Sequence, residues 1–409
     1  MTATSFIWPL VTATSVAIQA VAWLGLLYHY LLLAASTLKT KSQPTVCADR
    51  SRSFAIAIPA HNEETVLAET VRLLAQLDYP RTQYDVFVVA DYCVDQTADT
   101  ARAAGATCYE RQEGSQGRKA HALRWLLDRI LDSPRGYDAV VVFDADSHVE
   151  PGFLTAMNQA LASGRAVLQG RRVMRTSGQG GFESIEAADM RINNLLRNQA
   201  KARLGLSCRL MGDAMCFTSA ILRQYGWPTE SLVEDREYGL YLGIQGVTVG
   251  YVPAAVSYGQ TAPSWRAASQ QRVRWYAGVH AIRRSLRANL LEAAISKHQW
   301  SSVDGAVEMI LPPFSVLGLL SAVGLGLALI RVPPHHTSVM LSCGALLLWV
   351  ALPFLCLTVD RAPATEFGAL AMAPAYLLWR LLIGLAARLG GKRVRWVRTV
   401  RREETKRLH

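Results

Sequence analysis

The fold is decided by residues 140–147, VVVFDADS. A run of β-branched and aromatic residues predicts a buried strand, and here it ends in two carboxylates, Asp144 and Asp146. In an open α/β sheet, ligands gather beyond the carboxyl ends of the strands. Two carboxylates at that edge can share a hard divalent cation, with a substrate pyrophosphate completing its shell. A capped turn with solvated acids is the alternative for so short a pattern.

Uncharged stretches flank this region on both sides. Residues 1–38, 309–330 and 332–359 contain no Asp, Glu, Lys or Arg, and each exceeds the roughly 20 apolar residues that cross a bilayer. The chain is therefore predicted to be an integral membrane protein. It would have an N-terminal transmembrane helix (1–38), a globular domain (51–262) and a C-terminal membrane block of two or three helices (309–389).

The charges predict an orientation and exclude some classes of function. Lys39 and Lys41 follow the first segment, so the positive-inside rule places the globular domain in the cytoplasm of a multi-pass protein of the cell (inner or plasma) membrane. The formal charge of +11 is concentrated in residues 266–287 and in the basic tail, 390–409. Basic residues beside membrane segments meet anionic lipid headgroups, so we expect no nucleic acid partner. Seven cysteines without a CxxC pair predict reduced thiols.

Strand and helix patterns alternate through the first half of the globular domain. Strands are predicted at 54–60, 84–90 and 107–109, and helices at 66–77 and 97–104. This alternation is typical of a parallel, doubly wound α/β sheet. Asn62 is expected to cap the first helix, and residues 167–171 are expected to form an edge strand. No glycine-rich dinucleotide or phosphate loop follows either of the first two strands.

Several polar residues are candidates for ligand binding, each with a structural alternative. Asp91, at the end of the second strand, suits a hydrogen bond to a ribose or base, or caps a helix. Lys119 lies in a glycine-flanked basic turn before a helix, where it could meet phosphate or solvent. Glu186, Asp189 and Asn193 share one face of a predicted helix over 182–203. That face could border an acceptor channel, although a solvated face is the favoured interpretation.

Four stretches follow one another along the chain: IPAHNEE at 58–64, ADYCVDQT at 90–97, KAHAL at 119–123 and DAD at 144–146. In this order they resemble the landmarks of the family 2 inverting glycosyltransferases, which have the GT-A fold, a Rossmann-like domain with a mixed, mainly parallel sheet. The resemblance implies a nucleotide-sugar donor and a Mg or Mn ion. It implies donor contacts from Pro59, Glu63, Asp91 and Lys119, with Asp144 near the ribose and diphosphate and Asp146 on the metal.

Two later stretches extend the resemblance to the acceptor. Gly212, in a turn within 209–217, corresponds to the glycine turn that lines the acceptor pocket in the family, and a glycine lets a sugar approach closely. The acidic pair Glu234-Asp235 corresponds to the family's catalytic pair. Asp235 would be the base that takes the proton from the acceptor hydroxyl as it attacks the anomeric carbon. An acidic helix start capped by Ser231 is the structural alternative.

A final motif, Gln271-x-x-Arg274-Trp275, looks like the signature of the membrane-embedded branch that includes cellulose, chitin and hyaluronan synthases. Gln and Arg one turn apart share a helix face. Trp275 can stack on an acceptor sugar while Arg274 offers charge to the departing diphosphate. The surrounding region, 263–298, has the composition of an interfacial amphipathic helix.

These observations lead to three functional hypotheses. The first is a synthase that extends a polysaccharide or oligosaccharide from a nucleotide sugar, with a uridine diphosphate sugar as the expected donor and a homo-oligomer or secretion partner supplying further helices. The second is a single transfer onto a membrane lipid such as a sphingolipid or diacylglycerol, because QxxRW occurs there too. The third is a non-catalytic, nucleotide-binding membrane subunit.

The membrane block contains a conflict of topology. A third apolar candidate, 367–387, carries Arg380. Three complete crossings after a cytoplasmic domain would place the basic tail outside, against the positive-inside rule. One crossing should therefore be re-entrant or interfacial, and the Arg380 segment is the expected one.

Overall fold

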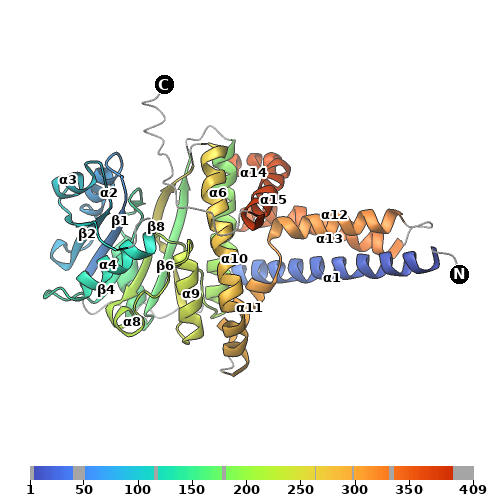
Figure 1. Ribbon diagram of the computed structural model, residues 1–409, viewed down its shortest axis with the longest axis horizontal. Helices are drawn as coiled ribbons and strands as arrows, with labels where there is room; N and C mark the ends of the chain where they lie inside the picture. The colour runs from blue at the N-terminus through green and yellow to red at the C-terminus, as the bar shows by residue number, and fades with distance from the viewer. Residues whose placement is uncertain are drawn as a thin grey trace.

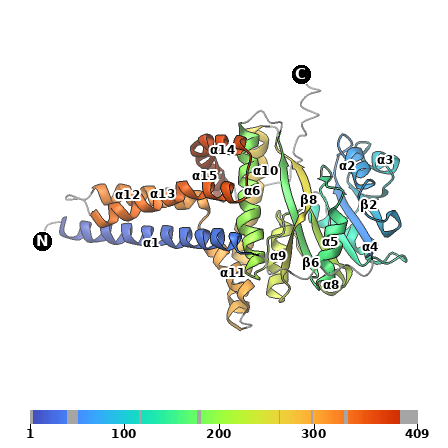
Figure 2. The same ribbon diagram turned by 180° about the vertical axis from the view of Figure 1, so that it is seen from behind.

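The computed structural model describes residues 4–39, 51–114, 118–176, 181–262, 264–296, 299–330 and 336–389. Figure 1 shows a sheet covered by helices at one end of the molecule and a bundle of long helices that projects away from it. Further helices lie between these two parts, across the base of the bundle, as the view from behind also shows (Figure 2).

One eight-stranded sheet forms the centre of the globular part within the described residues. In spatial order its strands are β3 (Thr107–Arg111), β2 (Tyr84–Asp91), β1 (Phe54–Ala60), β4 (Ala139–Val142), β7 (Met215–Thr218), β6 (Val167–Arg175), β8 (Val249–Gln260) and β5 (His148–Val149). The first four are parallel, and β6 is parallel to β8. Only β7 and β5 run antiparallel to their neighbours. The sheet is therefore mixed and mainly parallel, as the sequence predicted.

Both faces of the sheet are buried, which explains the uninterrupted apolar strands. Val141 and Phe143 belong to one core and Val140 and Val142 to the other. The helices on the first face are α2 (Leu67–Leu74), α3 (Thr97–Ala103) and α5 (Phe153–Ala162), and those on the second are α4 (Lys119–Leu131), α8 (Ser219–Tyr225) and α9 (Glu234–Ile244). A short 3₁₀ turn, η1 (Arg81–Gln83), precedes β2.

Two local expectations were wrong. Asn62 does not cap α2, which begins only at Leu67. Asn62 instead adopts a positive φ of 56° and its side-chain oxygen accepts a hydrogen bond from the Val94 amide at 2.9 Å, so it ties together the loops after β1 and β2. The strand predicted at an edge is the interior strand β6, because β7 and β8, which come later in the chain, pair with its two sides.

Three helices project from the globular part side by side (Figures 1 and 2). They are α1 (Thr4–Thr37), α12 (Phe314–Ile330) and α13 (His336–Val359). The side-chain amide of Gln19 on α1 donates to Ser342 Oγ on α13 at 2.9 Å. On α12, a Cβ at Gly318 would come within 2.4 Å of the Trp349 ring. A small residue and buried hydrogen bonds thus bring the helices together, as is common in membranes.

The remaining helices lie at the base of this bundle. They are α6 (Phe182–Asn193), the π-helical turn η2 (Asn194–Gln199), α7 (Ala200–Arg203), α10 (Trp265–Ser296), α11 (Trp300–Ile310), α14 (Ala364–Ala369), η3 (Leu370–Met372) and α15 (Ala373–Leu389). The expected span over 309–330 is broken, since α11 and α12 meet at a 54° bend. The break coincides with Pro312 and Pro313, which a continuous helix would not accommodate.

Length and composition identify Trp8–Thr37, His336–Val359 and Ala364–Leu389 as candidate spans, and α11 with α12 as a bent pair. Within the last of these, Arg380 forms an ion pair with Asp189 of α6 at 2.7 Å. An arginine in an apolar helix is costly unless it is paired, and this pair fixes α15 against α6. The predicted basic tail, 390–409, lies outside the described residues.

Candidate active site

The two carboxylates after β4 lie at the edge of the sheet where the sequence placed them. Asp144 is held between two cations. Lys119 Nζ lies 2.5 Å from Asp144 Oδ1, and Arg172 Nη2 lies 3.4 Å from Asp144 Oδ2. Asp146 is buried, at 7% exposure, whereas the Asp144 side chain is 27% exposed. Arg172 comes from β6, and nothing in its local sequence pointed to this role. The site therefore combines carboxylates with cations that could bind phosphate.

A buried acid, Asp213, fixes the turn that carries Asp144 and Asp146. Its carboxylate accepts hydrogen bonds from the Asp144 amide at 3.1 Å, from Ser147 Oγ at 2.6 Å and from Ser257 Oγ at 2.7 Å. Burial raises the pKa of Asp213, and the nearby Arg172 opposes this shift. Asp213 thus links the turn after β4 to β8 and determines where the two carboxylates lie.

Gly212 lies beside the carboxylate of Asp235 and the ammonium group of Lys119. Its φ of +78° favours glycine, and a Cβ at this position would come within 3.2 Å of Asp235 Oδ2. Its carbonyl oxygen accepts a hydrogen bond from Lys119 Nζ at 2.6 Å. A larger residue here would press on the carboxylate of Asp235, so the local backbone requires glycine.

Glu234 and Asp235 form the first turn of α9, where the helix dipole favours negative charge. Burial raises the pKa of Glu234 to about 7, against the opposing effect of Lys119, whose Nζ lies 4.0 Å from Glu234 Oε1. Burial also raises the pKa of Asp235. A carboxylate with a raised pKa is a better proton acceptor, so either acid has the chemistry of a general base.

The QxxRW residues reach this site from α10. Gln271, Arg274 and Trp275 line the same cavity as Asp144 and Asp235. Burial lowers the pKa of Arg274, and the charges of Glu234 and Asp144 act in the opposite direction. Arg274 is therefore close enough to the acids to interact with them, although more than 125 residues separate it from Asp144 in the chain.

The remaining predicted donor residues gather at the ends of β1 and β2. Pro59 lies in β1, and Glu63 follows it with its amide donating to Thr97 Oγ1 at 2.8 Å. Asp91 ends β2 and accepts a hydrogen bond from Arg111 Nε at 2.6 Å. Burial raises the pKa of Asp91, while Arg111 opposes that shift. No local sequence pattern marks Arg111, and its position opposite Asp91 follows only from the pairing of β2 with β3.

A cavity of about 1240 Å³ extends from Lys119, Asp144 and Asp235 to the helices at the base of the bundle. Its lining at one end includes Lys119, Asp144 and Asp235, and at the other Leu319 of α12 and Leu352 of α13. Pro59, Glu63, Asp91 and Asp146 lie outside the lining of this cavity.

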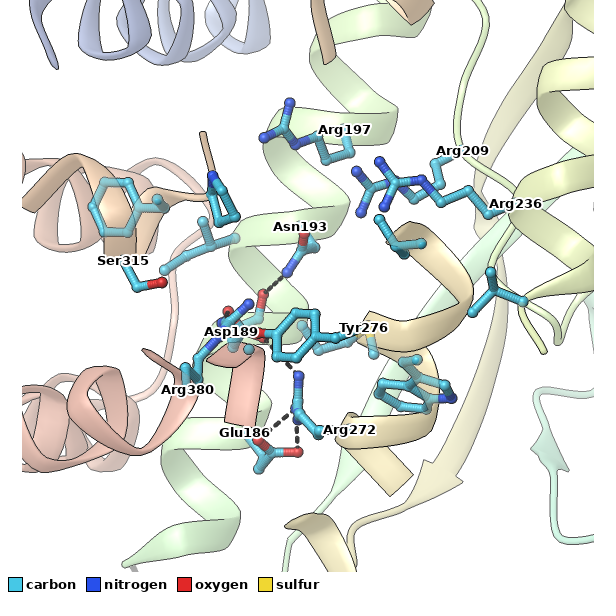
Figure 3. Close-up of a pocket in the computed structure, with 18 of the residues that line it drawn as sticks. Glu186, Asp189, Asn193, Arg197, Arg209, Arg236, Arg272, Tyr276, Ser315 and Arg380 are labelled. Atoms are coloured by element: carbon cyan, nitrogen blue, oxygen red, sulfur yellow. Dashed lines mark hydrogen bonds and ion pairs between the residues drawn. The ribbon is translucent and has the colours of Figure 1, made fainter. Parts of the chain in front are cut away.

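Polar residues of α6 form the wall of the cavity, so the expectation of a solvated face was wrong. Glu186 accepts hydrogen bonds from Arg272 of α10 at 2.6 Å and from the Tyr376 hydroxyl of α15 at 2.6 Å. Asp189 and Asn193 also line the cavity, and Figure 3 shows Asp189 between Arg380 and Tyr276. The physical reason is that α10 and α15, both distant in sequence, cover the polar face of α6.

The side chains near Asp144 supply only some of the ligands that a hard divalent cation needs. Among the described residues no group of three or more His, Cys, Asp or Glu side chains could hold a metal by itself. Asp144 and Asp146 supply carboxylate oxygens, the ligands that Mg and Mn prefer. These two residues fit an ion that takes its other ligands from water and from a bound diphosphate.

Comparisons with known proteins agree with this geometry. The chain is 23% identical over 252 residues to the probable glycosyltransferase YdaM of Bacillus subtilis, covering 54% of each chain. It is 27% identical over 239 residues to a β-monoglucosyldiacylglycerol synthase of Trichormus variabilis, covering 54% of this chain and 48% of that protein. The chain thus matches about half the length of these curated relatives.

A solved structure shares the fold. It is the mannosyltransferase PcManGT from Pyrobaculum calidifontis in complex with GDP-Man and Mn2+, at 17% identity and a TM-score of 0.57, covering 92% of this chain and 99% of that one. The model of the glycosyltransferase-like family 2 matches residues 51–278, more than half of the chain. The protein therefore belongs to the glycosyltransferase-like family 2 and has the GT-A fold.

Proposed function

We propose that this protein transfers a single sugar from a nucleotide sugar to a lipid acceptor at the membrane surface. The observation that carries the proposal is the continuous cavity whose lining includes Asp144 and Asp235 at one end and leucines of α12, α13 and α15 at the other. The similarity to β-monoglucosyldiacylglycerol synthases also supports a lipid acceptor. The globular part would face the cytoplasm.

The donor would extend along the carboxyl edge of the sheet. Glu63 and Asp91 would contact the nucleoside, which we expect to be uridine. Lys119, Arg172 and Arg274 are the cations nearest Asp144 and would meet the diphosphate. A divalent cation, Mg or Mn, held by Asp144 and Asp146 would neutralise charge on the diphosphate. Fixed cations at this position stabilise the charge that develops on a departing phosphate.

The acceptor would react beside Gly212. Asp235 would remove the proton from an acceptor hydroxyl, whose oxygen attacks the anomeric carbon of the donor sugar. The bond from that carbon to the diphosphate breaks as the new glycosidic bond forms, so the configuration inverts and the nucleoside diphosphate leaves. Glu234, next to Asp235, is the second acid of the pair, and its charge and that of Asp144 hold Lys119 protonated.

The apolar end of the cavity suits a hydrocarbon chain. Leu319, Leu352, Leu381 and Leu385 line it, and such residues can replace the apolar contacts that a lipid chain makes in the bilayer. A water-soluble sugar acceptor would gain nothing from these contacts. The QxxRW residues line the same cavity, and we assign them a role in positioning the headgroup.

The polysaccharide or oligosaccharide synthase hypothesis stays a prediction, and one experiment separates it from lipid transfer. The full chain in nanodiscs would be supplied with Mn or Mg and a panel of labelled nucleotide sugars, and the products sized by mass spectrometry. We expect one sugar on a lipid, and no product from Asp235→Asn. A ladder of oligomers would favour the synthase, and an unchanged rate in Asp235→Asn would exclude this residue as the base.

A further inference from the structure

Three arginines gather on one side of the cavity (Figure 3). Arg197 comes from η2, Arg209 from the segment before β7, and Arg236 from α9, and all three line the cavity. They surround Glu308 of α11, with which Arg209 forms an ion pair. Arg197 and Arg236 each have a guanidinium nitrogen 3.7 Å from Glu308 Oε1.

The charges in this arginine cluster do not balance. Behind the arginines, Lys201 Nζ lies 2.7 Å from both Asp304 Oδ2 and Glu308 Oε2. Four cations (Arg197, Arg209, Arg236 and Lys201) therefore share two carboxylates among the described residues, which leaves two positive charges in excess. Burial, and then the neighbouring Arg209, lower the pKa of Arg236 to about 9. The protein thus holds like charges close together, which is unfavourable unless an anion compensates them.

Buried charges are stable only when they are paired. The acid pair is almost completely buried, with Asp304 and Glu308 side chains 8% and 9% exposed, whereas the Arg197, Arg209 and Arg236 side chains keep 17%, 25% and 17% of their surface open. The excess charge is thus presented to the cavity rather than to the protein interior. A bound anion with several oxygens would satisfy three converging guanidinium groups.

The position of the cluster indicates what kind of anion would bind. Phe314 and Leu319 of α12 and Leu352 of α13 line the cavity together with the arginines. Arg236 directly follows Asp235 in the chain. An anion bound here would therefore lie between an apolar wall suited to a lipid chain and the carboxylate that we assign as the base. Lys119, Arg172 and Arg274, the cations assigned to the donor diphosphate, form a separate set around Asp144.

We propose that Arg197, Arg209 and Arg236 bind the phosphate of a lipid, so that the acceptor is an anionic phospholipid with a hydroxyl-bearing headgroup rather than a neutral lipid. The inference rests on the proposed function, because it names the substrate class for the same cavity. The phosphate would fix the depth of the lipid in the cavity and would hold its reactive headgroup oxygen beside Asp235.

The test uses the full chain in phosphatidylcholine nanodiscs doped with phosphatidic acid, phosphatidylglycerol or diacylglycerol of identical acyl chains. The readout is the increase in melting temperature that each lipid causes, measured alongside nucleotide affinity. The variant is Arg197→Gln/Arg209→Gln. The control is Arg284→Gln/Arg287→Gln, which removes two exposed arginines of α10 that do not line the cavity. A parallel titration of inorganic phosphate distinguishes a lipid headgroup from free phosphate.

We expect the two anionic lipids to stabilise the wild type and the control, and diacylglycerol to have no such effect. The Arg197→Gln/Arg209→Gln variant should lose the response, with lipid affinity reduced about tenfold or more, as for loss of a charge-assisted hydrogen bond. Without anionic lipid it should melt no lower than the wild type, because it removes excess like charge; a purely structural cluster would instead be destabilised.

Three results of the lipid and nucleotide titrations would overturn the inference. They are equal stabilisation by diacylglycerol, an unchanged response in the Arg197→Gln/Arg209→Gln variant, or an equal loss of nucleotide affinity in that variant, which would assign the arginines to the donor. Full stabilisation by inorganic phosphate alone would show a free-phosphate site instead. Transfer to diacylglycerol but not to anionic lipids would refute this inference and leave the proposed function intact, whereas no transfer to any lipid would refute the proposed function itself.

Discussion

Lys119 Nζ lies 2.5 Å from Asp144 Oδ1 and joins the start of α4 to the carboxylate that follows β4. The same ammonium donates to the Gly212 carbonyl at 2.6 Å. Burial alone would lower the pKa of Lys119, but the charges of Asp144 and Glu234 outweigh it and hold the pKa above its ordinary value. Lys119 is therefore a permanent cation that connects Asp144 to the turn at Gly212.

Replacing Lys119 tests this connection. We expect Lys119→Met to lower kcat/KM for sugar transfer by about 100-fold, the size of effect seen when one preorganised charge-stabilising donor is removed. Lys119→Arg should recover part of the loss, because it keeps the charge but not the geometry. Steady-state kinetics with labelled donor would measure both. A Lys119→Met enzyme with normal kcat/KM would show that this cation does not act on the reaction.

The raised pKa of Glu234 predicts a pH-dependent stability. The pKa rises from 4.5 to about 7 on folding, so between these values the native state binds the proton more tightly than the unfolded state. Stability should therefore fall as the pH rises from about 5 to 7 and stay lower above it, by about 3 kcal/mol. Glu234→Gln should remove this contribution and melt higher than the wild type at pH 8. If the difference in melting temperature between the two proteins were the same at pH 5 and at pH 8, the assignment would be contradicted.

The buried pair of Asp91 and Arg111 predicts a strong coupling. Their side chains are 7% and 4% exposed, and removing one partner of a buried pair costs about 3–5 kcal/mol because the other charge is left uncompensated. Arg111→Met should be destabilised by this amount and should lose nucleotide affinity. Asp91→Asn/Arg111→Met should recover much of the stability, so a double-mutant cycle by denaturant unfolding checks the prediction. Additive losses would argue against the coupling.

The arrangement of the helices predicts the topology of the chain. His336 begins α13 at the end of the bundle far from the sheet, and α13 returns the chain to the sheet end before α14 and α15 (Figures 1 and 2). We expect His336→Cys and Asp132→Cys, the latter on the globular part, to react with an impermeant maleimide from opposite sides of the membrane. Labelling of both from one side would show that α12 and α13 do not cross it.

Much of the donor half of the site could be predicted from the sequence, because it follows local rules. Strand ends carry Asp91 and Asp144, and their patterns of apolar residues are continuous enough to identify β2 and β4. Gly212 and Asp235 were found through family resemblance, and the structure brings them into contact distance. Once the order of the strands in the sheet is known, these residues are expected to lie close together.

The partners of these residues could not be predicted in the same way. Arg111, Arg172 and Asp213 reach the site through the pairing of strands, and no local pattern marks them. The three arginines of the cluster come from three separate segments of the chain and meet around Glu308. The polar face of α6 has the periodicity of a solvated helix, and only the packing of α10 and α15 against it turns it into a cavity wall.

The central claim is that one cavity joins the transfer site to the membrane, and blocking its lipid end tests it most directly. Gly384 of α15 lines the cavity, and Gly368 of α14 does not; a Cβ at either position would meet no atom within 4 Å. We expect Gly384→Trp to lower kcat/KM for the lipid acceptor by at least about tenfold with nucleotide affinity unchanged, and the matched Gly368→Trp to behave as the wild type. Normal transfer by Gly384→Trp would contradict the claim that the acceptor reaches Asp235 through this cavity.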